Sequence, residues 1–106
     1  MDENEVDHMK ITSTVQGSTL TIAPEGRLDM ITAPSLEKEF NDKLHDVSEV
    51  ILDFSNVEYI SSSGLRALLQ GLKMLKGNGT MKIVNANDVV REVFEVTGFI
   101  NYMTVE

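Results

Sequence analysis

The sequence predicts a single α/β domain with a mixed sheet of four to five strands, opened by an antiparallel hairpin, and about three to four helices. Three observations support this prediction. Short alternating or β-branched segments fill positions 9–24, two later apolar runs have strand length, and segments with apolar residues at helical spacing follow in alternation. Strands that alternate with helices favour parallel pairing through right-handed crossovers. A chain of 106 residues has the length of one domain.

The opening hairpin is predicted from strand-like segments at 9–15 and 20–24, which the turn residues Gln16, Gly17 and Ser18 join. Pro24 has no N–H group for a ladder, so we expect it at a strand end or a sheet edge. Residues 1–9 are acidic and polar. We expect them to form a flexible N-terminal segment, with the folded domain spanning residues 10–106.

A first helix is predicted from Thr32 through Asp46. Thr32 is a preferred N-cap residue, and Pro34 is tolerated in the first turn. Glu39 and Lys43 stand four residues apart, where opposite charges stabilise a helix. The apolar residues that recur at helical spacing are Leu36, Phe40, Leu44 and Val47.

A buried strand and a second helix come next. Residues 50–54 form a nearly continuous apolar run, which is typical of a strand covered on both faces. A short polar connection leads to a helix from about Ser62 to Lys76, which ends at Gly77. Its inward stripe consists of Leu65, Leu68, Leu69, Leu72 and Leu75.

The last third of the chain repeats this alternation. A short strand at 81–84 precedes a third helix, for which Asn87 is the expected N-cap and Gly98 the expected stop. Residues 100–105 are expected to close the sheet. The core face of the third helix is predicted to contain Val89, Val90, Val93 and Phe94.

Composition excludes several function classes. The chain has no cysteine, which rules out disulfides, Cys-ligated zinc and thiol catalysis and fits a reducing compartment. A net charge of −8 argues against unaided binding to nucleic acid or to an anionic membrane and weakly favours a basic partner. No apolar run approaches the roughly 20 residues that span a bilayer. We therefore expect a cytoplasmic protein.

No cofactor or metal is expected from the sequence. His8 and His45 are far apart in the chain and have no companions at ligand spacing, so solvated histidines are the simpler interpretation.

The most informative residues are Ser61, Ser62 and Ser63, which open the second helix. The N–H groups of a first helical turn lack partners, and the helix dipole favours negative charge there, so a phosphoryl group on one hydroxyl would leave the helix intact. From the residues alone, however, an N-cap followed by a turn is the simpler interpretation.

Several spaced motifs resemble one family. The stretch DFSNVEYISSSGLRALL, residues 53–69, resembles the central motif of the STAS domain, the fold of bacterial anti-sigma factor antagonists. Gly26-Arg27-Leu28-Asp29 resembles the family's Gly-x-Leu-Asp motif before its first helix. Val84-Asn85, Val89, Val93, Phe94 and Gly98-Phe99 resemble its last helix and strand. The motifs occur in the family's order over nearly the whole chain, which makes the resemblance specific.

The resemblance implies a switch protein rather than an enzyme. In the family, the unphosphorylated antagonist binds an anti-sigma factor, a serine kinase of the GHKL-type ATPase fold, and thereby frees the sigma factor. The kinase phosphorylates a serine at the helix start, binding ends, and a PP2C-type phosphatase resets the switch. That position corresponds to Ser62 here, with Ser63 and Ser61 as second choices. Ser61 replaces an Asp that well-known members carry, and we expect it to cap or support the helix.

A partner-binding face is predicted around the same helix. With the leucines inward, Arg66, Ala67, Gln70 and Met74 should face outward, although an ordinary solvated helix would show the same pattern. Asp29 is a further candidate, or it simply orders a turn, and Asp53 is expected to support the turn before Ser61. The full predicted surface is Asp29, Ser61, Ser62, Ser63, Gly64, Arg66, Ala67, Gln70 and Met74.

Two alternative functions compete with the sigma-factor switch. A STAS module could serve another assembly, in stress signalling, lipid transport or nucleotide sensing, without any sigma factor. A serine-nucleophile enzyme is disfavoured, because residues 59–64 lack a Gly-x-Ser-x-Gly elbow and neither histidine is placed as an obvious base.

Overall fold

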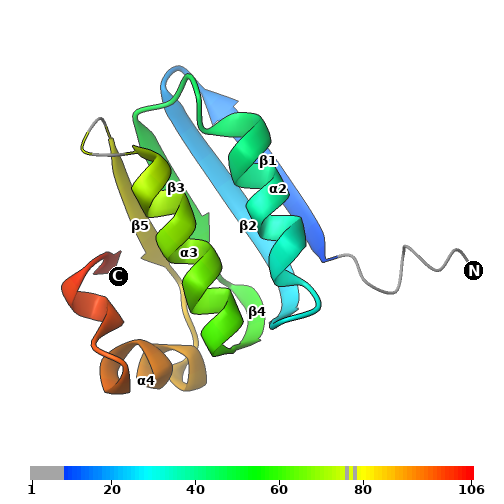
Figure 1. Ribbon diagram of the computed structural model, residues 1–106, viewed down its shortest axis with the longest axis vertical. Coiled ribbons are helices and arrows are strands. Elements are labelled where there is room, and N and C mark those ends of the chain that lie inside the picture. Colours follow the sequence, from blue (N-terminus) through cyan, green and yellow to red (C-terminus); the bar gives the residue numbers. More distant parts are fainter. Residues whose placement is uncertain (1–8, 76, 78) are drawn as a thin grey trace, which may run out of the picture.

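The computed structural model describes residues 9–75, 77 and 79–106. That part of the chain contains six strands, three α-helices and one 3-10 helix (Figure 1). In chain order they are β1 Lys10–Gln16, β2 Thr19–Leu28, α2 Ala33–Lys43, β3 Glu49–Asp53, β4 Asn56–Ile60, α3 Ser62–Leu75, β5 Thr80–Val84, α4 Asp88–Val96, η1 Phe99–Asn101 and β6 Thr104–Val105.

The predicted α/β fold with a mixed sheet is confirmed. The sheet order is β1-β2-β3-β5-β6, and β4 pairs with β2. β1 and β2 form the predicted antiparallel hairpin, whereas the β2–β3, β2–β4, β3–β5 and β5–β6 pairs are all parallel. The described residues hold one strand more than the predicted four to five. The additional strand is β4, where the sequence predicts a polar connection; only Val57 and Ile60 of its five residues are buried.

β2 continues past Pro24, where the sequence suggested a strand end. Residues 19–22 of β2 pair with β3, and residues 25–28 pair with β4. Pro24 lies between these two segments, where the ladder on that side of β2 is interrupted and a missing N–H costs least. Gly26, with φ of 101°, lies at a register shift within the pairing with β4. One long strand thus supports two parallel neighbours.

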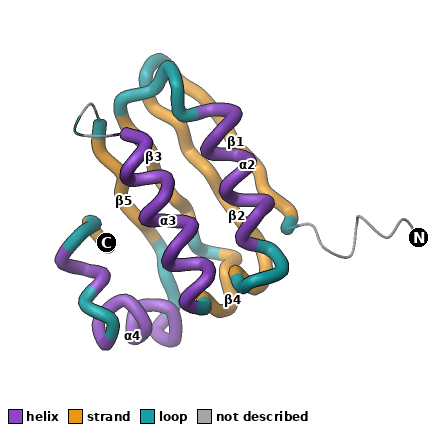
Figure 2. Tube along the Cα trace, viewed as in Figure 1, coloured by secondary structure: helices purple, strands orange, loops and turns teal. Residues whose placement is uncertain are grey.

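Two helices cover one face of the sheet. Figures 1 and 2 show α2 and α3 side by side over the sheet, running along the strands, with α4 set apart at one end. The helices approach closely at Gly71 of α3, where an added Cβ would lie 2.6 Å from the ring of Phe40 on α2. Phe40 is fully buried, as are Phe54 and Phe94. The core therefore lies between this helix pair and the sheet, and Phe94 of α4 joins the same core beside Phe54, with 6.3 Å between the two ring centroids.

α2 begins where predicted and ends earlier. Thr32 occupies the N-cap position, but its side chain makes no cap hydrogen bond because its hydroxyl serves the preceding loop instead. The helix ends at Lys43 rather than near Asp46, and Leu44 is its C-cap. The predicted Glu39–Lys43 ion pair is confirmed, with 2.8 Å between Nζ and Oε2.

α4 confirms its predicted cap and corrects its predicted core face. The Asn87 side-chain oxygen accepts a hydrogen bond from the Val90 N–H at 2.8 Å, and Gly98 follows the helix with φ of 75°. Val90 and Phe94 are buried as predicted. The prediction of Val89 in the core is wrong, because its side chain is 54% exposed.

Both ends of the domain differ from the prediction. Met9 belongs to the folded part, since it is buried and its N–H donates to Ser35 Oγ at 3.3 Å. Residues 1–8, which include His8, lie outside the described residues. At the other end, η1 takes residues 99–101, so the closing strand β6 is only two residues long.

No helix in the described part is long and apolar enough to cross a bilayer.

Candidate partner-binding and phosphorylation site

Three connections that follow parallel strands meet at one end of the sheet. The 29–32 loop follows β2, Ser61 follows β4, and residues 85–87 follow β5. The carboxyl ends of parallel strands lie at the same edge, and Figure 1 shows the starts of α3 and α4 there. The Asn87 Nδ2 group donates to the Val57 carbonyl of β4 at 3.1 Å, which ties the start of α4 to the strand that leads into the serines.

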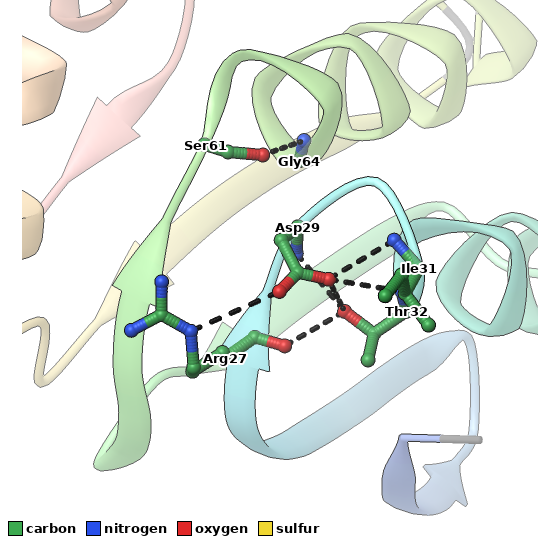
Figure 3. A network of polar contacts seen from close by, with 6 residues as sticks. All are labelled: Arg27, Asp29, Ile31, Thr32, Ser61 and Gly64. Carbon is green, nitrogen blue, oxygen red and sulfur yellow. Dashed lines mark hydrogen bonds and ion pairs between the residues drawn. The ribbon is translucent and has the colours of Figure 1, made fainter. Parts of the chain in front are cut away.

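Ser61 is the residue that fixes the start of α3. Its N–H donates to the Leu28 carbonyl of β2 at 2.9 Å, and its carbonyl accepts from the Leu65 N–H at 3.0 Å. Its hydroxyl accepts from the Gly64 N–H at 3.5 Å, a long bond (Figure 3). The capping role expected of Ser61 is therefore what its contacts provide.

The three serines are not equivalent. Ser62 is exposed, whereas Ser61 and Ser63 are half-buried. Ser62 and Ser63 are the first two residues of α3, whose N–H groups have no acceptor within the helix. Gly64 is buried, and an added Cβ would lie 2.8 Å from the Leu28 carbonyl oxygen and 2.7 Å from Ile60 Cγ1. Close packing beneath Gly64 therefore holds the Ser62 hydroxyl at the surface.

The exposed face of α3 differs from the predicted one. Arg66 and Gln70 are exposed as expected, but Ala67 is fully buried and Met74 is half-buried against the core. Placing Ala67 on the outward face was wrong. α2 packs beside α3, so small residues on this side of the helix serve helix packing, as Gly71 does against Phe40. The outward strip of α3 is therefore polar: Ser62, Arg66, Gln70 and Lys73.

Asp29 organises the loop that lies beside the start of α3. Its Oδ1 atom accepts from the Ile31 N–H at 3.0 Å and the Thr32 N–H at 3.2 Å (Figure 3). Thr32 Oγ1 accepts from the Asp29 N–H at 2.9 Å and donates to the Arg27 carbonyl at 2.7 Å. The pKa of the Asp29 carboxyl is lowered, mainly by the hydrogen bond from the Thr32 N–H and also by the one from the Ile31 N–H. Asp29 is thus an ionised loop-ordering group with one oxygen already engaged.

The second Asp29 oxygen faces Arg27. The Arg27 Nε atom lies 3.8 Å from Asp29 Oδ2, and the guanidinium lies 4.6 Å from the centre of the Tyr59 ring on β4. A cation over an aromatic face is attracted to it, even at a partly exposed site. Through these two contacts, Arg27 links the 29–32 loop to β4.

Asp53 supports the turn between β3 and β4. Its Oδ1 accepts from the Ser55 hydroxyl at 2.6 Å, from the Ser55 N–H at 3.1 Å and from Asn85 Nδ2 at 3.1 Å. The Ser55 hydroxyl is the main cause that holds the pKa of Asp53 below its ordinary value. Asp53 therefore acts at the entrance of β4 rather than directly before Ser61.

The lowered pKa of Asp53 predicts a loss of stability in acid. A carboxyl whose folded pKa lies below its unfolded value, about 3.9 for Asp, stabilises the fold above that value and stops doing so as pH falls through the folded pKa. We expect the contribution of Asp53 to the unfolding free energy to be constant above about pH 5 and to fall below about pH 4. In Asp53→Asn this fall should be shallower. Urea unfolding at several pH values measures it, and equal slopes in both proteins would contradict the prediction.

Sequence reasoning missed two residues of this region. Met30 and Ile31 follow Asp29 directly and are the exposed apolar residues of the loop. No periodicity marks a loop, so the only available signal was an apolar pair placed after the Gly-x-Leu-Asp motif. Among the described residues, no three His, Asp or Glu side chains gather as a metal site would require.

Comparison with known proteins identifies the family. The family model described as STAS domain matches residues 10–106. The chain belongs to the STAS domain family. It is 34% identical over 100 residues to BtrV of Bordetella bronchiseptica, named as a candidate anti-sigma factor antagonist, covering 92% of this chain and 85% of that protein. It is 29% identical to the anti-sigma-B factor antagonist of Staphylococcus aureus, covering 92% of this chain and 93% of that protein.

Solved structures share the fold of this STAS domain. An anti-sigma factor antagonist from Mycobacterium paratuberculosis superposes with a TM-score of 0.84 at 23% identity, over 93% of this chain and 86% of that one. The Bacillus cell fate determinant SpoIIAA, solved in its phosphorylated form, superposes with a TM-score of 0.69 at 21% identity, over 92% of this chain and 90% of that one. At these identities the likeness concerns the fold alone.

Proposed function

We propose that this STAS domain is a phosphorylation-switched anti-sigma factor antagonist. The unphosphorylated form binds an anti-sigma factor and releases its sigma factor, and a phosphate on Ser62 ends that binding. The observation that carries the proposal is the arrangement at the start of α3, where Ser62 alone of the three serines is exposed and Ser61 supplies the cap. The names of the two relatives at 34% and 29% identity support it.

A phosphate at this position acts on the interface and spares the fold. Phosphoserine adds a charge of about −1.5 to −2 and three acceptor oxygens. The first turn of a helix favours negative charge through its N–H groups and dipole, so α3 retains its structure. In a docked interface the same charge has to lose its water and repels any carboxylate, so the partner is released.

The proposed partners are proteins only. The anti-sigma factor is a serine kinase of the GHKL-type ATPase fold, and a PP2C-type phosphatase removes the phosphate. The domain itself has a regulatory, non-enzymatic role in the cytoplasm, with no direct contact to nucleic acid or membrane. Its charge of −8 supports this assignment, because polyanions would be repelled.

The test is to locate the phosphate. Incubation of the full chain with the anti-sigma factor kinase from the same cell and Mg-ATP is expected to add one phosphoryl group, which peptide mass spectrometry places on Ser62. Ser62→Ala should abolish the modification, and the neighbouring Ser63→Ala should retain it. A phosphate found only on Ser61 or Ser63 would overturn the site. A chain left unmodified by that kinase would overturn the switch.

A further inference from the structure

Two large apolar side chains are exposed in the loop beside the serines. Met30 is 75% exposed and Ile31 is 56% exposed. They are adjacent in the 29–32 loop, so together they form one apolar projection, which we call the Met30–Ile31 tip. Exposed apolar patches on a folded domain are often protein-binding sites, and methionine is enriched at protein interfaces.

The loop that carries the tip is held in one conformation. The Asp29 carboxylate and the Thr32 hydroxyl bind each other's backbone N–H groups, and Asp29 also binds the Ile31 N–H. The Thr32 hydroxyl is further bonded to the Arg27 carbonyl, and the Ala33 N–H donates to the Asp29 carbonyl at 2.8 Å. Little backbone entropy remains to be lost when a partner docks. The free energy gained by burying the two apolar side chains is therefore not offset by the ordering of the loop.

The tip and the phosphorylation site share one rigid junction. The hydrogen bond from the Ser61 N–H to the Leu28 carbonyl measures 2.9 Å, and it joins the residue before Asp29 to the residue before Ser62. Gly64 packs on the same carbonyl, since a Cβ there would lie 2.8 Å from it. A partner that covers Ser62 therefore meets the 29–32 loop on the same end of the sheet (Figure 3).

We propose that Met30 and Ile31 are the apolar anchors by which the unphosphorylated domain holds the anti-sigma factor, and that Asp29 is a positioning residue for them. The proposal rests on the proposed function. The occupant is the protein that covers Ser62, because the Ser61–Leu28 hydrogen bond joins the start of α3 to the loop that carries the tip, and the charged pair Arg27–Asp29 adjoins that loop. The partner surface that fits is an apolar pocket with a polar rim.

The test compares the tip with an equally exposed apolar residue elsewhere. Isothermal titration of the anti-sigma factor into Met30→Ser/Ile31→Ser should show binding at least tenfold weaker than wild type, about 1.4 kcal/mol. Val96→Ser is the matched control, because Val96 is 77% exposed but lies in the last turn of α4. It should bind within about twofold of wild type. Thermal melts should be unchanged in both variants, since the side chains are exposed.

The role of Asp29 is tested by two replacements. Asp29→Asn keeps an oxygen that can accept from the Ile31 and Thr32 N–H groups, whereas Asp29→Ala removes it. If Asp29 positions the loop, binding should be close to wild type in Asp29→Asn and severalfold weaker in Asp29→Ala. Equal losses in both would mean that the charge itself contacts the partner, which overturns the positioning role.

The outcomes separate this inference from the proposed function. Loss of binding in Ser62→Asp with unchanged binding in Met30→Ser/Ile31→Ser would overturn the anchor role alone. A wild-type chain that does not bind the anti-sigma factor would overturn both. If sedimentation shows a wild-type dimer that Met30→Ser/Ile31→Ser dissociates, the occupant is a second copy and the assignment to the anti-sigma factor is wrong.

Discussion

Ser62→Asp is expected to weaken binding of the anti-sigma factor about a hundredfold, while Ser62→Ala binds like wild type. A carboxylate forced into a docked interface loses its hydration without gaining a partner, and an unpaired buried charge costs several kcal/mol. A hundredfold loss of affinity corresponds to about 2.8 kcal/mol, which is within the cost of burying an unpaired charge. The alanine variant buries no charge, so its affinity should be retained.

Both variants should keep the fold, which makes the comparison clean. The α3 cap is supplied by Ser61 and the close packing by Gly64, so the exposed Ser62 side chain is not needed for either. An acidic residue in the first turn is also favourable for the helix dipole. Urea unfolding of both variants should therefore give free energies of unfolding within about 0.5 kcal/mol of wild type.

A charge-matched control separates a local effect from a change in net charge. Ser18→Asp adds the same charge in the exposed β1–β2 turn, at the opposite end of β2 from Ser61. We expect it to bind like wild type at physiological salt, because charges farther apart than about 8 Å are screened there. Equal affinities for Ser62→Asp and Ser62→Ala would rule out charge exclusion as the mechanism of the switch.

Local signals in the sequence were sufficient for some elements of the fold. Asn87 and Gly98 delimit α4 as predicted, because a cap and a left-handed stop depend on a few adjacent residues. The capping contact of Ser61 follows from the same local geometry. β4 could not be predicted, since its pairing with residues 25–28 of β2 depends on a partner about 30 positions earlier.

The partner face could be predicted only in part for the same physical reason. Helical periodicity places Arg66 and Gln70 outward, and they are exposed. It cannot show that α2 packs on the side of α3 that carries Gly71, and this is why the outward placement of Ala67 fails. Met30 and Ile31 lie in a loop without periodicity, and their exposure follows from the hydrogen bonds of Asp29 and Thr32, which only the three-dimensional structure reveals.

Gly64→Ala is expected to destabilise the domain by about 1–2 kcal/mol. Overpacking a filled core site costs about 1–3 kcal/mol, and the better helix propensity of alanine returns up to about 1 kcal/mol. The new methyl group would meet the Leu28 carbonyl at 2.8 Å and Leu28 Cγ at 2.9 Å. That carbonyl also accepts the Ser61 N–H, so it cannot move away without weakening the bond that positions the serines.

Urea unfolding measures the effect, with Ser63→Ala as the control at the preceding, half-buried position of the same helical turn. The control should lie within about 0.5 kcal/mol of wild type, with an unchanged dependence on urea. Because the clash displaces the start of α3 from β2, Gly64→Ala should also be phosphorylated more slowly at Ser62. Wild-type stability in Gly64→Ala would mean that the contact between α3 and Leu28 is loose, and Ser62 would then not be held at the surface by close packing.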